Sequence, residues 1–155
     1  MREQIMEAVK AAMKSGDKRR LSTLRLIQAA IQDRDIAARV DSKGQATGQD
    51  KIGDTELLQL LQKMIKQRRD SATMYADAGR TELAEQEQAE IAIIEEYLPK
   101  QMSEDEVAAA VGAVVQEIGA AGLKDMGRTM AALKERYAGQ MDFGKASGIV
   151  KANLS

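Results

Sequence analysis

The sequence predicts an all-α protein, and three observations support that prediction. Apolar residues recur at intervals of three and four almost throughout the 155 residues, and no stretch alternates apolar and polar residues as a strand does. Helix-capping residues stand at the starts of several periodic segments. The single proline, Pro99, interrupts the pattern once. We therefore expect an N-terminal helical bundle with a long helical hairpin, followed by a small C-terminal domain of three helices.

The N-terminal part predicts two helices followed by a loop. Residues 2–15 form an amphipathic helix that stops at Ser15-Gly16, and Asp17 is the expected N-cap of a second helix. Residues 40–55 are polar and glycine-rich, which predicts a flexible loop. The apolar stripe of the second helix consists of Leu21, Leu24, Ile27 and Ile31.

A helical hairpin is expected next. Asp54 or Thr55 caps a long helix that ends at Ala78-Gly79, where glycine suits a left-handed cap. Thr81 starts the return helix, which continues until Pro99 because the residue before proline disfavours the α conformation. Pro99 therefore sets the boundary between an N-terminal domain, 1–98, and a C-terminal domain, 99–155. The two apolar stripes are Leu57, Leu61, Met64, Ala72 and Tyr75, and Leu83, Ile91, Ile94 and Leu98.

The C-terminal domain begins with a capping box, Ser103 to Glu106, in which hydroxyl and carboxylate each accept a free backbone N–H. Three stripes follow: Val107, Val111, Val114, Val115 and Ile118; Leu123, Met126, Met130, Leu133 and Tyr137; and Phe143, Ala146, Val150 and Leu154. Residues 139–146 match the phosphate-loop pattern G-x-x-x-x-G-K, but Ala146 stands where magnesium needs a hydroxyl, and no strand precedes. We expect a helix-to-helix turn capped by Asp142.

Composition excludes several kinds of chemistry. The chain has neither His nor Cys, which removes the imidazole base, the Ser-His and Cys-His nucleophiles and the ordinary zinc site. We therefore assign no catalytic residue, no metal and no cofactor. No apolar stretch is long enough for a signal peptide or a membrane span, so a cytoplasmic protein without membrane association is expected.

Charge is unevenly distributed along the chain. Residues 17–70 hold 12 basic and 8 acidic residues, 77–106 hold 2 and 10, and 107–155 hold 6 and 4. Such segregation can mark an RNA-facing surface beside an acidic one, or only solvated helix faces. The candidate phosphate contacts in the C-terminal domain are Lys124, Arg128, Lys134, Arg136, Lys145 and Lys151. Because the chain has only four aromatic residues, shape recognition of folded RNA suits it better than single-strand binding.

One ion pair is predicted inside the hairpin. Arg68 falls within the apolar stripe of the long helix, and Glu87 falls within that of the return helix. Folding at Gly79 brings both to similar heights, so we expect a largely buried Arg68–Glu87 pair that fixes the register. A ligand or catalytic site built from Arg68, Glu87 and Ser71 is the alternative, and it requires an open pocket.

Several motifs together resemble the YqeY family, also called GatB/YqeY domain proteins. They stand in the family's order over essentially the whole chain. The motifs are GDKRRLSTLR at 16–25, KQRRDS at 66–71, AGR at 78–80, EEYLPKQMS at 95–103 and KDMGR at 124–128. Within the tail, Gly127 and Arg128 match the helix opening, Gly139 matches the turn glycine, and Lys145 and Lys151 fall on the last helix.

The resemblance implies an all-helical fold whose tail is similar to the C-terminal domain of the GatB component of the glutamine-dependent aspartyl/glutamyl-tRNA amidotransferase, which engages tRNA. It also implies the label of carbon–nitrogen ligase with glutamine as amido donor. The chain lacks counterparts of that enzyme's catalytic parts, so we expect an accessory module that binds tRNA or a tRNA-processing enzyme. The alternative is a helical adaptor that binds a protein partner, served by the acidic segment 82–106.

Overall fold

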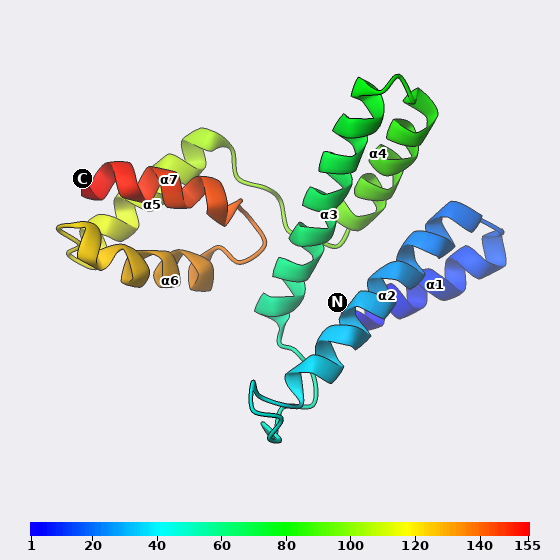
Figure 1. Ribbon diagram of the computed structural model, residues 1–155, viewed down its shortest axis with the longest axis horizontal. Helices are drawn as coiled ribbons and strands as arrows, with labels where there is room; N and C mark the ends of the chain where they lie inside the picture. Colours follow the sequence, from blue (N-terminus) through cyan, green and yellow to red (C-terminus); the bar gives the residue numbers. More distant parts are fainter. The chain divides into compact units, whose positions relative to one another are not determined.

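The computed structural model describes residues 1–155 and confirms the all-α fold (Figure 1). The chain divides into two compact units, Met1–Tyr97 and Leu98–Ser155, which we call unit 1 and unit 2. This division falls one residue before the expected boundary. None of the helices is both long and apolar enough to pass through a lipid bilayer.

Unit 1 consists of two helical hairpins. Its elements are α1 (Arg2–Ser15), α2 (Lys18–Ala38), α3 (Asp54–Asp77) and α4 (Thr81–Glu95). Helix α1 packs on α2. Helices α3 and α4 lie side by side as an antiparallel pair, and α4 also contacts α2 (Figure 1). Fully buried aliphatic side chains join these helices, among them Leu24, Ile27, Leu57, Leu61 and Ile94.

Most helix ends in unit 1 follow the predicted local signals. Gly16 ends α1 with a left-handed φ of 73°, and the Asp17 carboxylate accepts the N–H of Arg20 at 3.1 Å as the N-cap of α2. Two ends differ. The N-cap of α3 is Gly53, not Asp54 or Thr55, and α4 ends at Glu95 rather than at Pro99.

The early end of α4 follows from a tightened last turn. The N–H groups of Glu96 and Tyr97 bond to the carbonyls three residues earlier, on Ile93 and Ile94, at 3.3 and 3.1 Å. This 3₁₀ spacing ends the α-helix before Leu98, the residue that Pro99 restricts.

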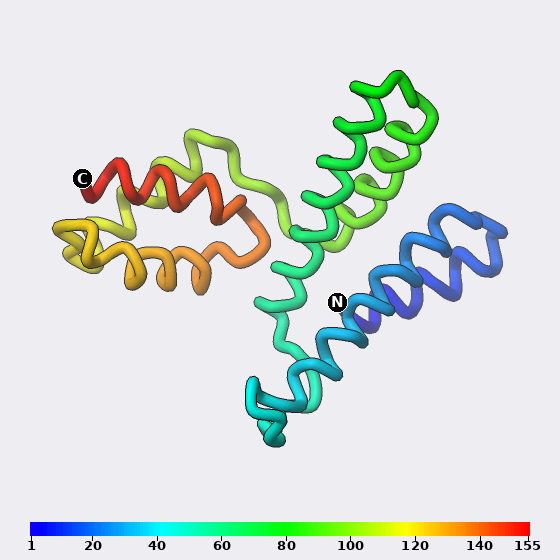
Figure 2. The backbone as a smooth tube through the Cα atoms, in the orientation of Figure 1, coloured from blue at the N-terminus to red at the C-terminus, as the bar shows by residue number.

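The segment between α2 and α3 extends beyond the ends of both helices (Figure 2). It is closed at its base by an isolated antiparallel bridge between Val40 and Ala46. The Asp41 carboxylate accepts the N–H groups of Lys43 and Gln45 at 2.8 and 2.9 Å, which forms a local turn. The segment predicted as a loop is thus irregular but hydrogen-bonded; its flexibility stays a prediction.

Unit 2 is a three-helix bundle with one short 3₁₀ turn. Its elements are α5 (Glu104–Glu117), η1 (Leu123–Asp125), α6 (Met126–Arg136) and α7 (Phe143–Leu154). The predicted capping box of Ser103 and Glu106 is present at the start of α5. Asp142 caps α7, so the segment 139–146 is the predicted helix-to-helix turn. The aliphatic core includes Val111, Val114, Leu133, Ala146 and Val150, each fully buried.

Candidate nucleic-acid interface

The six basic residues predicted as phosphate contacts are all solvent-exposed, but they fall into two groups. The two arginines, Arg128 and Arg136, are held by acids of unit 2. The four lysines make no side-chain hydrogen bond or ion pair. The lysines are Lys124, Lys134, Lys145 and Lys151.

Arg136 ties the end of α6 to the end of α5. Its two Nη atoms donate to the two carboxylate oxygens of Glu117 at 2.5 and 3.1 Å. The hydrogen bond from Arg136 lowers the pKa of Glu117, and the same contact raises the pKa of Arg136. Such a bidentate pair gives the guanidinium and the carboxylate two hydrogen bonds each. Arg136 therefore contributes to the packing of α6 on α5 and is not a free cation.

Arg128 closes the corner between α5 and α6. Its Nη1 donates to the carbonyl of Ile118 at 3.0 Å, and its Nη2 donates to Asp125 Oδ1 at 3.2 Å. The other carboxylate oxygen of Asp125 accepts the N–H of Ala121 at 2.9 Å. This backbone hydrogen bond, followed by the one from Arg128, lowers the pKa of Asp125. The guanidinium of Arg128, predicted from the sequence as a phosphate contact, is therefore already hydrogen-bonded within unit 2.

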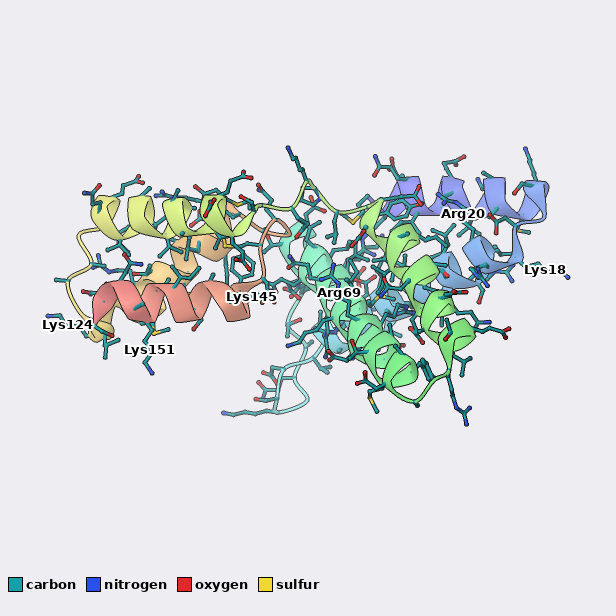
Figure 3. The ribbon with its side chains drawn as sticks, turned by 90° about the horizontal axis from the view of Figure 1, so that it is seen from above. Lys18, Arg20, Arg69, Lys124, Lys145 and Lys151 are labelled. Atoms are coloured by element: carbon teal, nitrogen blue, oxygen red, sulfur yellow. The ribbon has the colours of Figure 1, made fainter.

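The free lysines lie on η1, α6 and α7. Because η1 contacts α7, Lys124 and Lys151 come together at one end of the bundle, and Lys145 lies at the other end of α7 (Figure 3). Lys134 is on α6, which runs antiparallel to α7 (Figure 1). The six-residue spacing of Lys145 and Lys151 corresponds to about 9 Å along the helix axis. The lysines therefore spread positive charge over the length of the bundle.

The first turn of α7 does not offer free backbone N–H groups to an anion. The Asp142 carboxylate accepts the N–H of Gly144 at 2.8 Å and that of Lys145 at 3.3 Å. The N-terminus of α7 is therefore a poor site for a phosphate, because its N–H groups at Gly144 and Lys145 already have an acceptor.

In unit 1, Arg68 pairs with Glu90, and the predicted Arg68–Glu87 pair is wrong in its partner. Arg68 Nε donates to Glu90 Oε2 at 3.1 Å, and the two side chains are 14% and 27% exposed. Arg68 and Glu90 are each eleven residues from Gly79, whereas Glu87 is eight. Because both helices rise about 1.5 Å per residue, equal spacing from the turn gives equal height. Glu87 lies near the pair: burial and the charge of Glu90 raise its pKa, and the charge of Arg68 lowers it.

The catalytic alternative needs Arg68, Ser71 and Glu87 to share an open pocket. A groove between α2 and α3 is lined by Arg68 and Gln67, but its lining does not include Ser71 or Glu87. The structure also has no cluster of three or more acidic residues placed to hold a metal ion.

Sequence reasoning missed a buried carboxylate in unit 1. Asp35, which is 8% exposed, accepts two hydrogen bonds from Arg2, both at 2.8 Å, and one from the N–H of Ile52 at 2.9 Å. Arg2 also donates to the carbonyl of Ile52 at 3.1 Å. The signal was in the stripe of α2, because Asp35 continues the spacing of Ile27 and Ile31.

Comparison with known proteins gives a family and a relative. The model of a family described as Yqey-like protein matches residues 2–154. A protein of Meyerozyma guilliermondii named "Altered inheritance of mitochondria protein 41, mitochondrial" is 38% identical over 82 residues. That match covers 52% of this chain and 43% of the relative, so the chain spans less than half of that protein's length.

Proposed function

The chain belongs to the YqeY family, and we propose that unit 2 is an accessory module that binds tRNA through its phosphates. The observation that supports this proposal is the contrast between paired arginines and unpaired lysines. Lys124, Lys134, Lys145 and Lys151 are exposed without a carboxylate partner. A phosphate that meets them displaces no existing ion pair.

The charge arrangement suits sequence-independent binding to a folded nucleic acid. Lysines that neutralise phosphates release condensed counterions, and this supplies affinity without reading bases. The aromatic residues of unit 2, Tyr137 and Phe143, are partly buried against its core. They therefore offer little surface on which an unpaired base could stack.

The choice of tRNA as the folded RNA rests on the sequence resemblance alone, which implies a tail similar to the tRNA-engaging domain of the amidotransferase. We propose no stand-alone ligase reaction, because Arg68 is engaged by Glu90 and the groove that Arg68 lines does not include Ser71 or Glu87. The carbon–nitrogen ligase label then belongs to a larger enzyme that such a module would serve. The cytoplasmic location likewise stays a prediction.

The test is binding of total tRNA to the full chain at several salt concentrations. If the four lysines each meet one phosphate, the slope of log K against log[salt] is about −3. The variant Lys124→Ala/Lys145→Ala/Lys151→Ala removes three of these charges, so its slope should shrink to about −1. The matched control, Lys14→Ala/Lys18→Ala/Lys43→Ala, removes three exposed, unpaired lysine charges from unit 1 and should keep the original slope.

Two results would overturn the proposal. The first is absence of tRNA binding even at low salt. The second is an equal loss of slope in the unit 1 control, which would show that net charge rather than unit 2 carries the binding. Duplex DNA as a competitor separates recognition of folded tRNA from binding to any polyanion. In either failure, the adaptor served by the acidic segment 82–106 becomes the next hypothesis.

A further inference from the structure

We propose that the groove between α2 and α3 of unit 1 binds an acidic amphipathic helix of a partner protein. The groove has a volume of about 400 Å³ and lies entirely within unit 1. It is independent of the lysines of unit 2, so this proposal does not rest on the proposed tRNA binding.

The floor of the groove is apolar. Leu26, Ala29 and Ala30 of α2 face Leu60 and Met64 of α3 across it. Leu26 is 46% exposed, although Leu24 and Ile27, close to it in the sequence, are fully buried. Small side chains on α2 opposite larger ones on α3 leave room for inserted side chains.

A helix is the occupant that fits two helical walls. The α3 wall of the groove carries Leu60, Met64 and Gln67. These positions follow the three- and four-residue spacing of one helix face. The lined part of α3, from Leu60 to Arg68, is about 12 Å long, which matches a helix of about two turns. Helices that lie in such grooves insert apolar residues at this same spacing.

The rim of the groove favours an acidic partner. Lys63 on α3 and Arg34 on α2 are exposed and make no ion pair, and Asp33 is the one acid in the lining. Arg68, also on the rim, is already paired with Glu90. The two unpaired cations stand on opposite walls, so carboxylates on both flanks of a helix would meet opposite charge. Nucleic acid fits this groove less well, because its floor offers aliphatic surface rather than donors.

The experiment uses selection and matched variants. A displayed library of helical peptides with randomised charged positions is selected against the full chain, and the selected peptides are measured by fluorescence anisotropy. We expect enriched peptides to carry an apolar stripe with acidic flanks. Leu26→Glu and Lys63→Glu should each weaken their binding about tenfold or more, the size of a hot-spot loss.

Two control variants change the same residue types outside the groove. Ile36→Glu alters an equally exposed apolar residue of α2, and Lys66→Glu alters an exposed lysine of α3; neither lines the groove. Both should keep binding within about twofold. If Leu26→Glu fails to fold by circular dichroism, the comparison of Lys63→Glu with Lys66→Glu decides.

The proposal is overturned if the library yields no binder, if the enriched peptides are not acidic, or if control and groove variants lose binding equally. It is also overturned if sedimentation shows a dimer of the full chain that Leu26→Glu dissociates, because the occupant is then a second copy.

Discussion

Units 1 and 2 differ in which basic residues they leave unpaired. Unit 1 leaves both arginines and lysines without an ion pair, such as Arg34 and Lys63, whereas unit 2 leaves only lysines. In unit 1, arginines form the ion pairs that join separate elements: Arg2–Asp35, Arg20–Glu96, Arg68–Glu90 and Arg69–Glu95. In unit 2, the arginines are again paired, but the four lysines on η1, α6 and α7 stay free. Arg20 and Arg69 lie within unit 1, and Lys145 and Lys151 project from α7 (Figure 3).

The prevalence of arginine in the ion pairs follows from the chemistry of the two side chains. A guanidinium forms two parallel hydrogen bonds with a carboxylate and is weakly hydrated, so arginine suits contacts that hold a fold. An ammonium is a compact, strongly hydrated charge that exchanges partners easily. A paired arginine in this protein therefore indicates a structural contact, and a free lysine indicates a surface available to a ligand.

The largest expected effect tests whether unit 2 depends on its aliphatic core. Leu133 is fully buried, so Leu133→Ala should lower the free energy of unfolding by about 2–5 kcal/mol through lost burial and the cavity left behind. Urea unfolding followed by hydrogen exchange of unit 2 amides measures this. Arg136→Ala, the control, should cost far less because the side chain is exposed. If the two variants lost the same free energy of unfolding, the surface ion pair would matter as much to unit 2 as its buried core.

The next effect tests the buried pair of unit 1. Asp35→Ala leaves Arg2 and the N–H of Ile52 without their acceptor. Because hydrogen bonds to charged groups are stronger than neutral ones, we expect a loss of about 2–3 kcal/mol. Thermal unfolding, together with hydrogen exchange of the backbone amides of α1 and α2, measures this loss of stability. A loss no larger than that of Asp33→Ala, an exposed neighbour, would show that the pair contributes little.

The same carboxylate predicts a pH dependence. Hydrogen bonding from Arg2 lowers the pKa of Asp35 below its ordinary value of 3.8, so the folded protein binds this proton less readily than the unfolded chain. The stabilisation is therefore complete above the unfolded pKa and is lost as pH falls through the folded pKa. The stability difference between wild type and Asp35→Asn should be constant above about pH 5 and shrink below it. A constant difference down to strong acid would contradict this sign.

A smaller effect distinguishes the two possible partners of Arg68. A double-mutant cycle of Arg68→Met with Glu90→Gln should give a coupling of about 1 kcal/mol. The same cycle with Glu87→Gln should give less. Glu87→Gln alone should raise stability at neutral pH, because burial raises the pKa of Glu87 and disfavours its charge. A larger coupling to Glu87 would restore the register predicted from the sequence.

The smallest effect is expected from the free lysines. The side chains removed in Lys124→Ala/Lys145→Ala/Lys151→Ala make no hydrogen bond or ion pair. The free energy of unfolding should therefore change by no more than about 0.5 kcal/mol. Thermal melting checks this, and it also shows that any loss of tRNA binding is not a loss of fold. A drop as large as that of Asp35→Ala would mean that the lysines, too, hold the structure.

Short-range signals in the sequence predicted more than long-range ones. Asp17, Ser103 and Asp142 cap helices as expected, because a cap is decided within three or four residues. The N-cap of α3 was missed because Gly53 has no capping side chain. The partner of Arg68 was assigned one turn off, since the register of a hairpin depends on how many residues each side of the turn contributes.

The sequence predicted which basic residues belong to the candidate site, but not which of them are left without an ion-pair partner. Lys145 and Arg136 are both cationic residues, and both are exposed. Only the fold brings Glu117 opposite Arg136 and leaves Lys145 without a partner. The groove between α2 and α3 lay outside any linear pattern, because its walls come from two helices separated by a loop.

The segment between α2 and α3 offers a place for protein engineering. At one end the N–H of Thr47 bonds to the carbonyl of Arg39 at 3.0 Å, and at the other Ile52 is fixed by Asp35. The residues between Asp41 and Gln45 are all exposed, and Gly44 turns there with a φ of 78°. An affinity handle or a small reporter inserted at this tip would be carried outside both anchors. The protein could thus be labelled without altering either its lysine surface or its groove.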